Sequence, residues 1–128
     1  MRVLLDAHTL LWAVTGDKKL SRTAHDTLAA FGNEVYVSAA SAWEISTKYR
    51  LGKLPDAESL AQNVNRIVGQ LGFQELPISI QHAQRAGLLP GHHRDPFDRM
   101  LIAQAQAENL PLVSNETLFD SFGLSRIW

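Results

Sequence analysis

The sequence predicts an α/β protein with a central parallel sheet and helices on both of its faces. Short apolar runs, such as residues 2–6 and 34–38, have the composition of strands that are buried on both faces. Segments with apolar residues at helical spacing separate these runs, so strand and helix signals alternate along the chain. This alternation is typical of a parallel sheet with right-handed crossovers.

The first quarter of the chain is expected to hold one strand and two helices. Residues 2–6, RVLLD, are the strand, and residues 8–14 form a short helix that ends at Gly16. Ser21 has the side chain of an N-cap, and the helix that it begins extends to about residue 31. A glycine and an asparagine follow there and favour the helix end.

The middle of the chain continues the alternation. Residues 34–38, EVYVS, are the second strand. A helix over residues 38–51 is expected to end at Gly52, because a left-handed backbone conformation is wanted after a helix. Residues 59–71 are predicted to form one helix, since their apolar residues fall on one side. A weaker strand follows at residues 73–77.

The last third of the chain is expected to contain two helices and then shorter elements. Residues 79–88 form a helix that its first serine caps, and residues 89–95 form a loop. Asp95 caps the helix over residues 96–108, whose first position is a proline. A strand, a short helix and a final strand complete the chain, at residues 110–114, from about residue 116, and at residues 125–128.

Composition narrows the function classes. The chain has 128 residues, which fits one domain over residues 1–128. It contains no cysteine, which excludes disulfides and thiolate metal sites and is compatible with a reducing cytoplasm. The apolar N-terminal segment lacks a cleavage site and is too short to span a bilayer, so we expect a cytoplasmic protein without a membrane partner. A net charge of −1 provides no global basic field for nucleic acid.

Four acidic residues each stand where an apolar run gives way to a helix. Asp6 ends the first strand, and Glu44 lies about two turns into the helix after the second strand. Asp98 is in the first turn of its helix, and Glu116 directly follows a strand. Ligands of open parallel sheets bind outside the carboxyl ends of the strands, so these carboxylates are expected to gather at one edge. Oxygen ligands without cysteine favour Mg²⁺ or Mn²⁺ over zinc.

Each of these acids also has an ordinary structural interpretation. Asp6 and Glu116 stand at helix starts, and Asp95 has the pattern of an N-cap. Asp98 is at the third helical position, where an acid bonds back to the cap and complements the helix dipole. Capping does not explain the apolar surroundings of Asp6 and Glu44, because a buried unpaired carboxylate is costly. A cation shared among several carboxylates removes that cost.

Basic residues and one hydroxyl near the acids are candidate substrate contacts. Arg94 and Arg99 flank Asp95 and Asp98, and Lys48 belongs to a small basic cluster. All three are candidate contacts to phosphate, although a solvated helix face is the ordinary interpretation of the cluster. Thr9 follows Asp6 by three residues, where its hydroxyl would reach a metal ion or its water, unless it only fills the helix.

The histidines and tryptophans carry weaker signals. His92 and His93 are adjacent, so they point in different directions and are expected to be loop residues. His8 is expected to be packed or on the surface. Trp12 and Trp43 are flanked by apolar residues and are expected in the core, although aromatic rings can also stack on RNA bases.

Four segments of the chain, taken together, resemble a known family. They read LLDAHTLLW, SAWEISTKYRLGKL, HHRDPFDRMLIAQA and LPLVSNETLFDSFGLSRIW. In this order and spacing they are similar to the PIN-domain family and, within it, to the toxins of bacterial VapBC toxin–antitoxin pairs. The resemblance covers nearly the whole chain and implies a three-layer α/β/α fold with a parallel five-stranded sheet.

The resemblance also implies a function and a set of site residues. It implies an endoribonuclease that depends on Mg²⁺ or Mn²⁺, acts on an RNA substrate, and is held inactive by a VapB-type antitoxin; a homodimer is the expected assembly. Asp6, Glu44 and Asp98 match the family's three acids. Glu116 falls where many members carry a fourth acid, usually Asp, so its longer side chain is expected to act through water. Asp95 is interpreted first as a helix cap and then as a support for the metal ligands.

Two other classes remain as alternatives. A receiver-type signalling domain would need an acidic pair after the first strand, but Asp6 is followed by Ala7 and His8. It would also need a phosphorylated aspartate after a central strand, and no strand plainly leads into Asp56. A non-catalytic RNA- or protein-binding module on the same fold is the second alternative, and the glutamate at position 116 leaves room for it.

Overall fold

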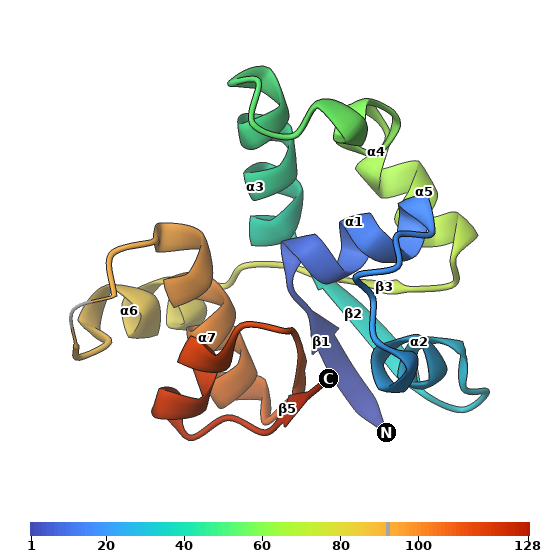
Figure 1. Ribbon diagram of the computed structural model, residues 1–128. Coiled ribbons are helices and arrows are strands. Elements are labelled where there is room, and N and C mark those ends of the chain that lie inside the picture. Colours follow the sequence, from blue (N-terminus) through green and yellow to red (C-terminus); the bar gives the residue numbers. More distant parts are fainter. Residues whose placement is uncertain (92) are drawn as a thin grey trace.

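The computed structural model describes residues 1–91 and 93–128, so the prediction for His92 lies outside the described residues. Five parallel strands form one sheet in the order β3-β2-β1-β4-β5 (Figure 1), as predicted. The strands are β1 (Arg2–Leu5), β2 (Glu34–Ser38), β3 (Gln74–Leu76), β4 (Leu112–Val113) and β5 (Arg126–Ile127). β1 is central because it pairs with both β2 and β4.

Seven α-helices and two 3₁₀ helices are found in the described residues. The α-helices are α1 (Ala7–Thr15), α2 (Arg22–Ala29), α3 (Ala39–Arg50), α4 (Glu58–Gln62), α5 (Val64–Gln70), α6 (Ile80–Leu88) and α7 (Pro96–Glu108). The 3₁₀ helices are η1 (Pro55–Ala57) and η2 (Thr117–Phe122). No helix among the described residues has both the length and the apolar composition needed to cross a bilayer.

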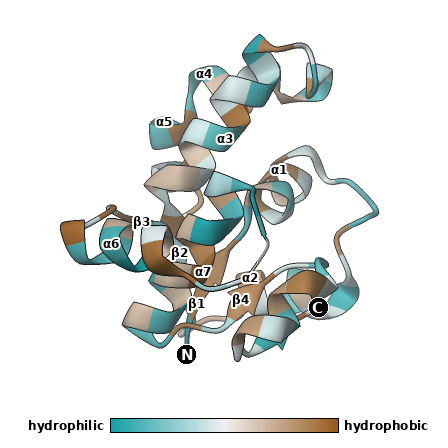
Figure 2. Cartoon of the chain, turned by 90° about the vertical axis from the view of Figure 1, so that its left-hand side faces the viewer, coloured by the Kyte–Doolittle hydropathy of each residue, from teal (hydrophilic) through white to brown (hydrophobic). Residues whose placement is uncertain are grey.

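The sheet separates two hydrophobic clusters, which gives the predicted three layers. Side chains alternate along a strand, so Val3 and Leu5 of β1 face one cluster and Leu4 faces the other. The first cluster includes residues of α1, α2, α4 and α5, and the second includes residues of α7 and η2. Figure 1 shows α1 and α2 on one side of the sheet and α7, with α6 outside it, on the other. Figure 2 shows hydrophobic residues concentrated along the strands and the inner side of α7.

The predicted capping residues bound their helices as expected. The side chains of Ser21, Ser79 and Asp95 each accept a hydrogen bond from a backbone N–H in the first turn, and Ser38 caps α3 in the same way. Gly52 follows the end of α3 with a φ of 75°, in the left-handed region that favours glycine.

The prediction of one helix over residues 59–71 is wrong, because the chain forms the separate helices α4 and α5. The break is at Asn63, whose φ of −140° leaves the helical region. Its side-chain amide donates to the Ser59 carbonyl at 2.8 Å and so replaces part of the helical bonding. Asparagine competes with the helix backbone in this way, and apolar spacing alone does not register that competition.

The expected core position of Trp43 is also wrong. Its side chain is 61% exposed on α3 and packs edge-on against Phe97 of α7, with ring centroids 4.9 Å apart. Trp12, by contrast, is half-buried and packs against the first hydrophobic cluster, where its ring centroid lies 5.9 Å from that of Trp128. Apolar neighbours in sequence do not fix burial on a helix, because adjacent residues point about 100° apart.

Candidate metal centre

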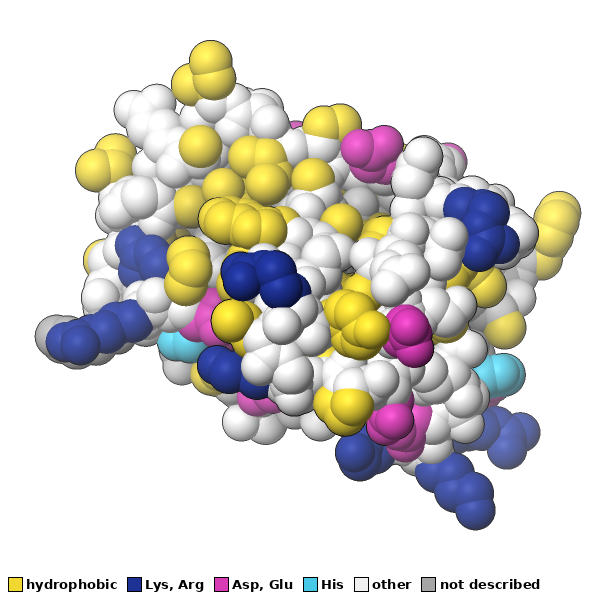
Figure 3. All heavy atoms as spheres, turned by 90° about the horizontal axis from the view of Figure 1, so that it is seen from above, with side chains coloured by type: hydrophobic (Ala, Val, Ile, Leu, Met, Phe, Trp, Pro, Cys, Tyr) yellow, Lys and Arg dark blue, Asp and Glu magenta, His cyan; other side chains and the backbone are white. Residues whose placement is uncertain are grey.

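The predicted acids line one small cavity of about 220 Å³ at the carboxyl ends of the strands. Its charged and titratable lining consists of Asp6, His8, Glu44, Lys48, Asp95, Asp98 and Glu116. These residues come from the end of β1, from α1, α3 and α7, and from the segment after β4. We call this space the acidic cavity. Figure 3 looks onto this end of the molecule and shows acidic, basic and hydrophobic side chains side by side.

Asp6 is held between two elements and is only 4% exposed. It is the N-cap of α1, so its Oδ1 accepts the backbone N–H of Thr9 at 2.8 Å. Its Oδ2 accepts the hydroxyl of Ser114, the residue after β4. The Ser114 oxygen in turn accepts the backbone N–H of Glu116 at 3.0 Å. Capping and a place in the acidic cavity are therefore compatible for Asp6.

Sequence reasoning did not single out Ser114, although a signal for it exists. Ser114 directly follows an apolar strand that pairs with β1, and it is fully buried. Because parallel neighbours end at the same edge, a polar residue at the end of β4 must face the end of β1. Its hydroxyl satisfies one oxygen of the buried Asp6 carboxylate.

Glu44 is equally buried, at 4% exposed, and has a cationic partner. The Nζ of Lys48, one turn further along α3, donates to its Oε2 at 2.5 Å. Burial by itself lowers the pKa of Lys48, but the hydrogen bond and charge of Glu44 and the charges of Asp95 and Asp98 raise it above its ordinary value. Lys48 therefore stays protonated beside the acids.

Asp98 carries the clearest electrostatic perturbation of the acidic cavity. Burial, together with the charges of Asp95 and Glu44, raises the pKa of Asp98 to about 6, although the hydrogen bond and charge of His93 oppose the rise. The Nε2 of His93 lies 3.0 Å from Asp98 Oδ2. Asp95 accepts the backbone N–H groups of Phe97 and Asp98, at 2.9 and 3.1 Å, which confirms its interpretation as a helix cap.

The structure brings only one of the four candidate substrate contacts into the acidic cavity, namely Lys48. The Arg99 guanidinium donates hydrogen bonds to the backbone carbonyls of Ala86, Leu89 and His93, at 2.7–3.1 Å. These bonds connect α7 to the end of α6. Thr9 is fully buried, and its hydroxyl donates to the Val113 carbonyl at 3.0 Å.

Arg94, the fourth candidate, is exposed and does not line the acidic cavity. Glu116 is also exposed, but it does reach the lining of that cavity.

The donor chemistry fits a hard divalent cation. Among the described residues, no three His, Asp or Glu side chains stand close enough together, as placed, to hold a metal ion. Glu44 and Asp98 instead pair with Lys48 and His93, whose side chains are 27% and 24% exposed. The oxygens of these carboxylates are nevertheless ligands that Mg²⁺ and Mn²⁺ prefer.

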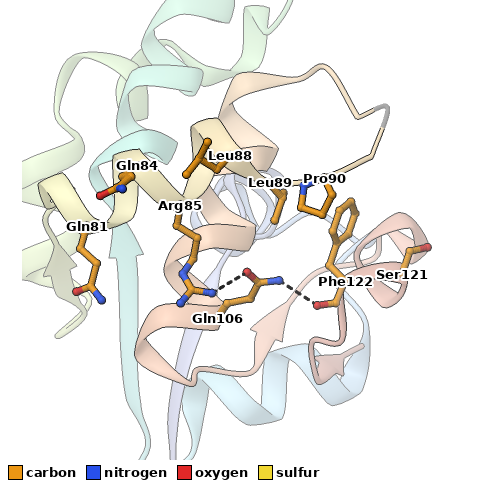
Figure 4. A pocket seen from close by; sticks show the side chains of 9 residues that line it. All are labelled: Gln81, Gln84, Arg85, Leu88, Leu89, Pro90, Gln106, Ser121 and Phe122. Atoms are coloured by element: carbon orange, nitrogen blue, oxygen red, sulfur yellow. Dashed lines mark hydrogen bonds between the residues drawn. The ribbon is translucent and has the colours of Figure 1, made fainter.

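A larger cavity of about 590 Å³ lies between α6, the end of α7 and η2 (Figure 4). We call it the glutamine-lined cavity. Its lining consists of Gln81, Gln84, Arg85, Leu88, Leu89, Pro90, Gln106, Ser121 and Phe122. Its lining contains no carboxylate, and Gln106 accepts a hydrogen bond from Arg85 and donates one to the Phe122 carbonyl. Size favours this cavity, but the chemistry of its side chains does not support catalysis, so we place the candidate centre at the acidic cavity.

Comparison with known proteins decides the family. The profile of the PIN domain matches residues 3–123. The chain belongs to the PIN domain family. Ribonuclease VapC16 of Mycobacterium tuberculosis (strain ATCC 25618 / H37Rv) is 46% identical to this PIN domain over 54 residues, which are 42% of this chain and 37% of that protein. The match therefore spans well under two-thirds of that relative's length.

Several solved structures share the fold of this chain, and VapBC assemblies are among them. VapBC2 from Rickettsia felis, bound to a DNA fragment from their promoter, has a TM-score of 0.71 at 19% identity, covering 98% of this chain and 97% of that chain. VapBC-1 from nontypeable Haemophilus influenzae has a TM-score of 0.68 at 14% identity, covering 98% and 96%. At these identities the likeness concerns the fold, and it confirms the predicted PIN-like α/β architecture.

Proposed function

We propose that this PIN domain is a divalent-metal-dependent endoribonuclease and the toxin of a VapBC-type toxin–antitoxin module. One observation carries the proposal. Carboxylates from four separate parts of the chain, Asp6, Glu44, Asp98 and Glu116, line one cavity, and the first two are almost fully buried. Burying an unpaired carboxylate costs free energy, and a cation shared among several carboxylates offsets that cost. Similarity to Ribonuclease VapC16 supports a ribonuclease rather than another hydrolase.

Each acid has a role that follows from its placement. Asp6 and Asp98 would hold the Mg²⁺ or Mn²⁺ ion directly, and Glu44 would complete the set or orient a water. Glu116, which is exposed, would act through water. Asp95 would support the ligands, because one of its oxygens already accepts the N–H of Asp98.

The chain's own residues would prepare an RNA phosphodiester for in-line hydrolysis. The cation, when bound, lowers the pKa of a water and neutralises charge on the phosphoryl oxygens. Lys48 would leave Glu44 and contact the phosphate, because its ammonium lines the same cavity. The Ser114 hydroxyl and the Thr9 N–H keep the Asp6 carboxylate in one orientation.

We further propose that residues 1–128 act as one PIN domain, form a homodimer and bind a VapB-type antitoxin. The antitoxin partner is supported by structures with the same fold, which are VapBC assemblies from Rickettsia felis and Haemophilus influenzae. The antitoxin would cover the acidic cavity. Sedimentation of the purified chain over a range of concentrations tests the dimer, and a monomer at every concentration would exclude it.

The decisive experiment combines stability with cleavage. Purified protein is melted in EDTA, Mg²⁺ and Mn²⁺, and RNA cleavage is followed under the same conditions. A ligand that binds only the folded state raises Tm by mass action, so both ions should raise it. The gain should vanish in Asp98→Asn. Cleavage that persists in EDTA, or in an Asp6→Asn protein that keeps its fold, would contradict the proposal.

A second candidate is a non-catalytic module that binds RNA or protein through the same face. The observation that favours it is that Glu44 and Asp98 already have side-chain partners, Lys48 and His93, without a metal ion. Comparing RNA binding with RNA cleavage at matched Mg²⁺ separates the two candidates. Binding without cleavage would support the module.

A further inference from the structure

A second cavity of about 450 Å³ lies beside the acidic cavity and has a volume typical of small-molecule sites. Its wall includes His8 and Trp12 of α1, Lys19 from the turn after α1, and Lys53 from the segment after α3. We call it the His8–Trp12 pocket. His8 also lines the acidic cavity, so the two spaces share a wall. A substrate held at the acids therefore has a neighbouring place for its next group.

The aromatic side of the pocket is formed by two neighbouring rings. The rings of His8 and Trp12 lie one turn apart on α1, with centroids 5.7 Å apart. The ring of the partly buried Trp128 contacts that of Trp12, at a centroid distance of 5.9 Å. The Nζ of the exposed Lys19 lies 5.9 Å from the Trp12 ring centroid, over its face. That face therefore meets the side chain of an exposed residue.

The two lysines of the pocket have no ion-pair partner among the described residues. Lys19 and Lys53 are both exposed, and no carboxylate of the described chain lies within 4.0 Å of their ammonium groups. Asp17 and Asp56 also line the pocket, and Asp17 accepts the backbone N–H of Lys19 at 2.9 Å. The pocket therefore carries two lysines and two aspartates. This mixed lining suits a nucleotide, whose base and ribose lie between phosphates, better than it suits a simple anion.

We propose that the His8–Trp12 pocket binds one unpaired nucleotide of the RNA substrate, next to the phosphate at the acidic cavity. The base lies against Trp12 and His8, and Lys19 and Lys53 contact the flanking phosphates. Proteins hold single-stranded RNA by stacking bases on aromatic rings within a groove that carries cations. The inference rests on the proposed ribonuclease function and adds a subsite that selects unpaired RNA over duplex.

The test compares two pairs of exposed basic residues. Lys19→Ala/Lys53→Ala removes the pocket cations, and Lys18→Ala/Arg66→Ala removes the same charge from exposed positions outside the pocket. Each protein is tested on a single-stranded oligoribonucleotide and on bis(p-nitrophenyl) phosphate, a small phosphodiester that has no nucleobase, ribose or flanking phosphate. The pocket pair should lose about 10-fold in kcat/KM on RNA, mainly through KM, and nothing on the small phosphodiester. Its log–log salt slope for RNA should also fall by about 1.4, because two phosphate contacts are lost.

A second variant tests the base contact separately. Trp12→Leu should weaken RNA cleavage by about 10-fold while leaving the small phosphodiester unaffected. Its fold is checked by thermal melting, since Trp12 also contacts Trp128. If the pocket pair cleaves RNA like the control pair, the subsite is excluded while the ribonuclease function stands. If the parent protein cleaves neither substrate in any divalent metal, the proposed function fails and the subsite fails with it.

Discussion

The glutamine-lined cavity is larger than the acidic cavity, but the smaller acidic cavity holds the carboxylates. The larger one, of about 590 Å³, is lined by amides, one arginine and apolar side chains (Figure 4). The smaller one, of about 220 Å³, gathers five carboxylates around Lys48 and His8. Neutral amides at a surface cost little free energy and find partners nearby, as Gln106 does with the Arg85 guanidinium and the Phe122 carbonyl. Buried carboxylates carry a real cost.

That difference teaches which observation identifies a functional site in this protein. Glu44 and Asp6 are 4% exposed, and the pKa of Asp98 is raised to about 6 by burial and by neighbouring acids. Charges that repel one another in a half-buried space are a feature of sites that bind cations or perform chemistry. Volume alone would have selected the other cavity. Four substitutions test this comparison, in order of decreasing effect.

Asp6→Asn should have the largest effect. The amide oxygen can still accept the Thr9 N–H, so the fold should persist, while the charge at the acidic cavity is reduced. Metal-dependent RNA cleavage should fall at least about 100-fold. The measurement is single-turnover cleavage in Mg²⁺, with circular dichroism to establish the fold. A folded variant with full activity would remove Asp6 from the site.

Asp98→Asn should stabilise the metal-free protein. The folded-state pKa of about 6 lies above the unfolded value of 3.8, so the ionised carboxylate destabilises the fold at neutral pH. That cost is complete above about pH 6 and disappears as the pH falls below 3.8. Removing it should raise the free energy of unfolding by about 1–3 kcal/mol at pH 7.5. Urea melts in EDTA at pH 7.5 and pH 4 measure the gain, which should shrink at the lower pH; a loss of stability at pH 7.5 would contradict the electrostatic account.

Lys48→Met should act in the opposite direction. It leaves the Glu44 carboxylate buried without its cation, which should lower the free energy of unfolding in EDTA by about 1–2 kcal/mol, because Lys48 is partly exposed. Mg²⁺ should then raise Tm more in the variant than in the parent, since the ion takes over the neutralising role. Lys18→Met, at an exposed position, is the matched control. Equal metal responses in all three proteins would exclude coupling between Lys48 and the metal site.

Gln106→Ala should have the smallest effect and belongs to the other cavity. It removes two long hydrogen bonds, to Arg85 and to the Phe122 carbonyl, at 3.3 and 3.2 Å. A loss of stability of about 0.5–1 kcal/mol is expected, with no change in RNA cleavage or in the metal-induced shift of Tm. Reduced cleavage with unchanged stability would show that the glutamine-lined cavity takes part in substrate handling, and the comparison between the cavities would break down.

Features that depend on short-range interactions were mostly predicted correctly, whereas some features that depend on the packing of distant elements were not. Caps such as Ser21, Ser79 and Asp95 were predicted correctly because a cap bonds to backbone groups within three residues. The break at Asn63 was missed because apolar spacing outweighs a single polar residue in such a prediction, although Asn63 bonds locally to Ser59. Trp43 was misplaced because its exposure depends on which side of α3 meets the rest of the molecule.

The sequence by itself determined the alternation of strands and helices, the parallel sheet, and the set of acids that belong near its carboxyl edge. Strand order places Asp6 and Glu116 at neighbouring strand ends, and helix position places Glu44 and Asp98 near them. Only the tertiary structure decided the partners of each charge. Ser114 bonds to Asp6 across 108 residues of sequence, and Arg99 is used by the carbonyls at the end of α6 instead of by a phosphate. Such pairings depend on distances between elements, and no local preference of the chain encodes those distances.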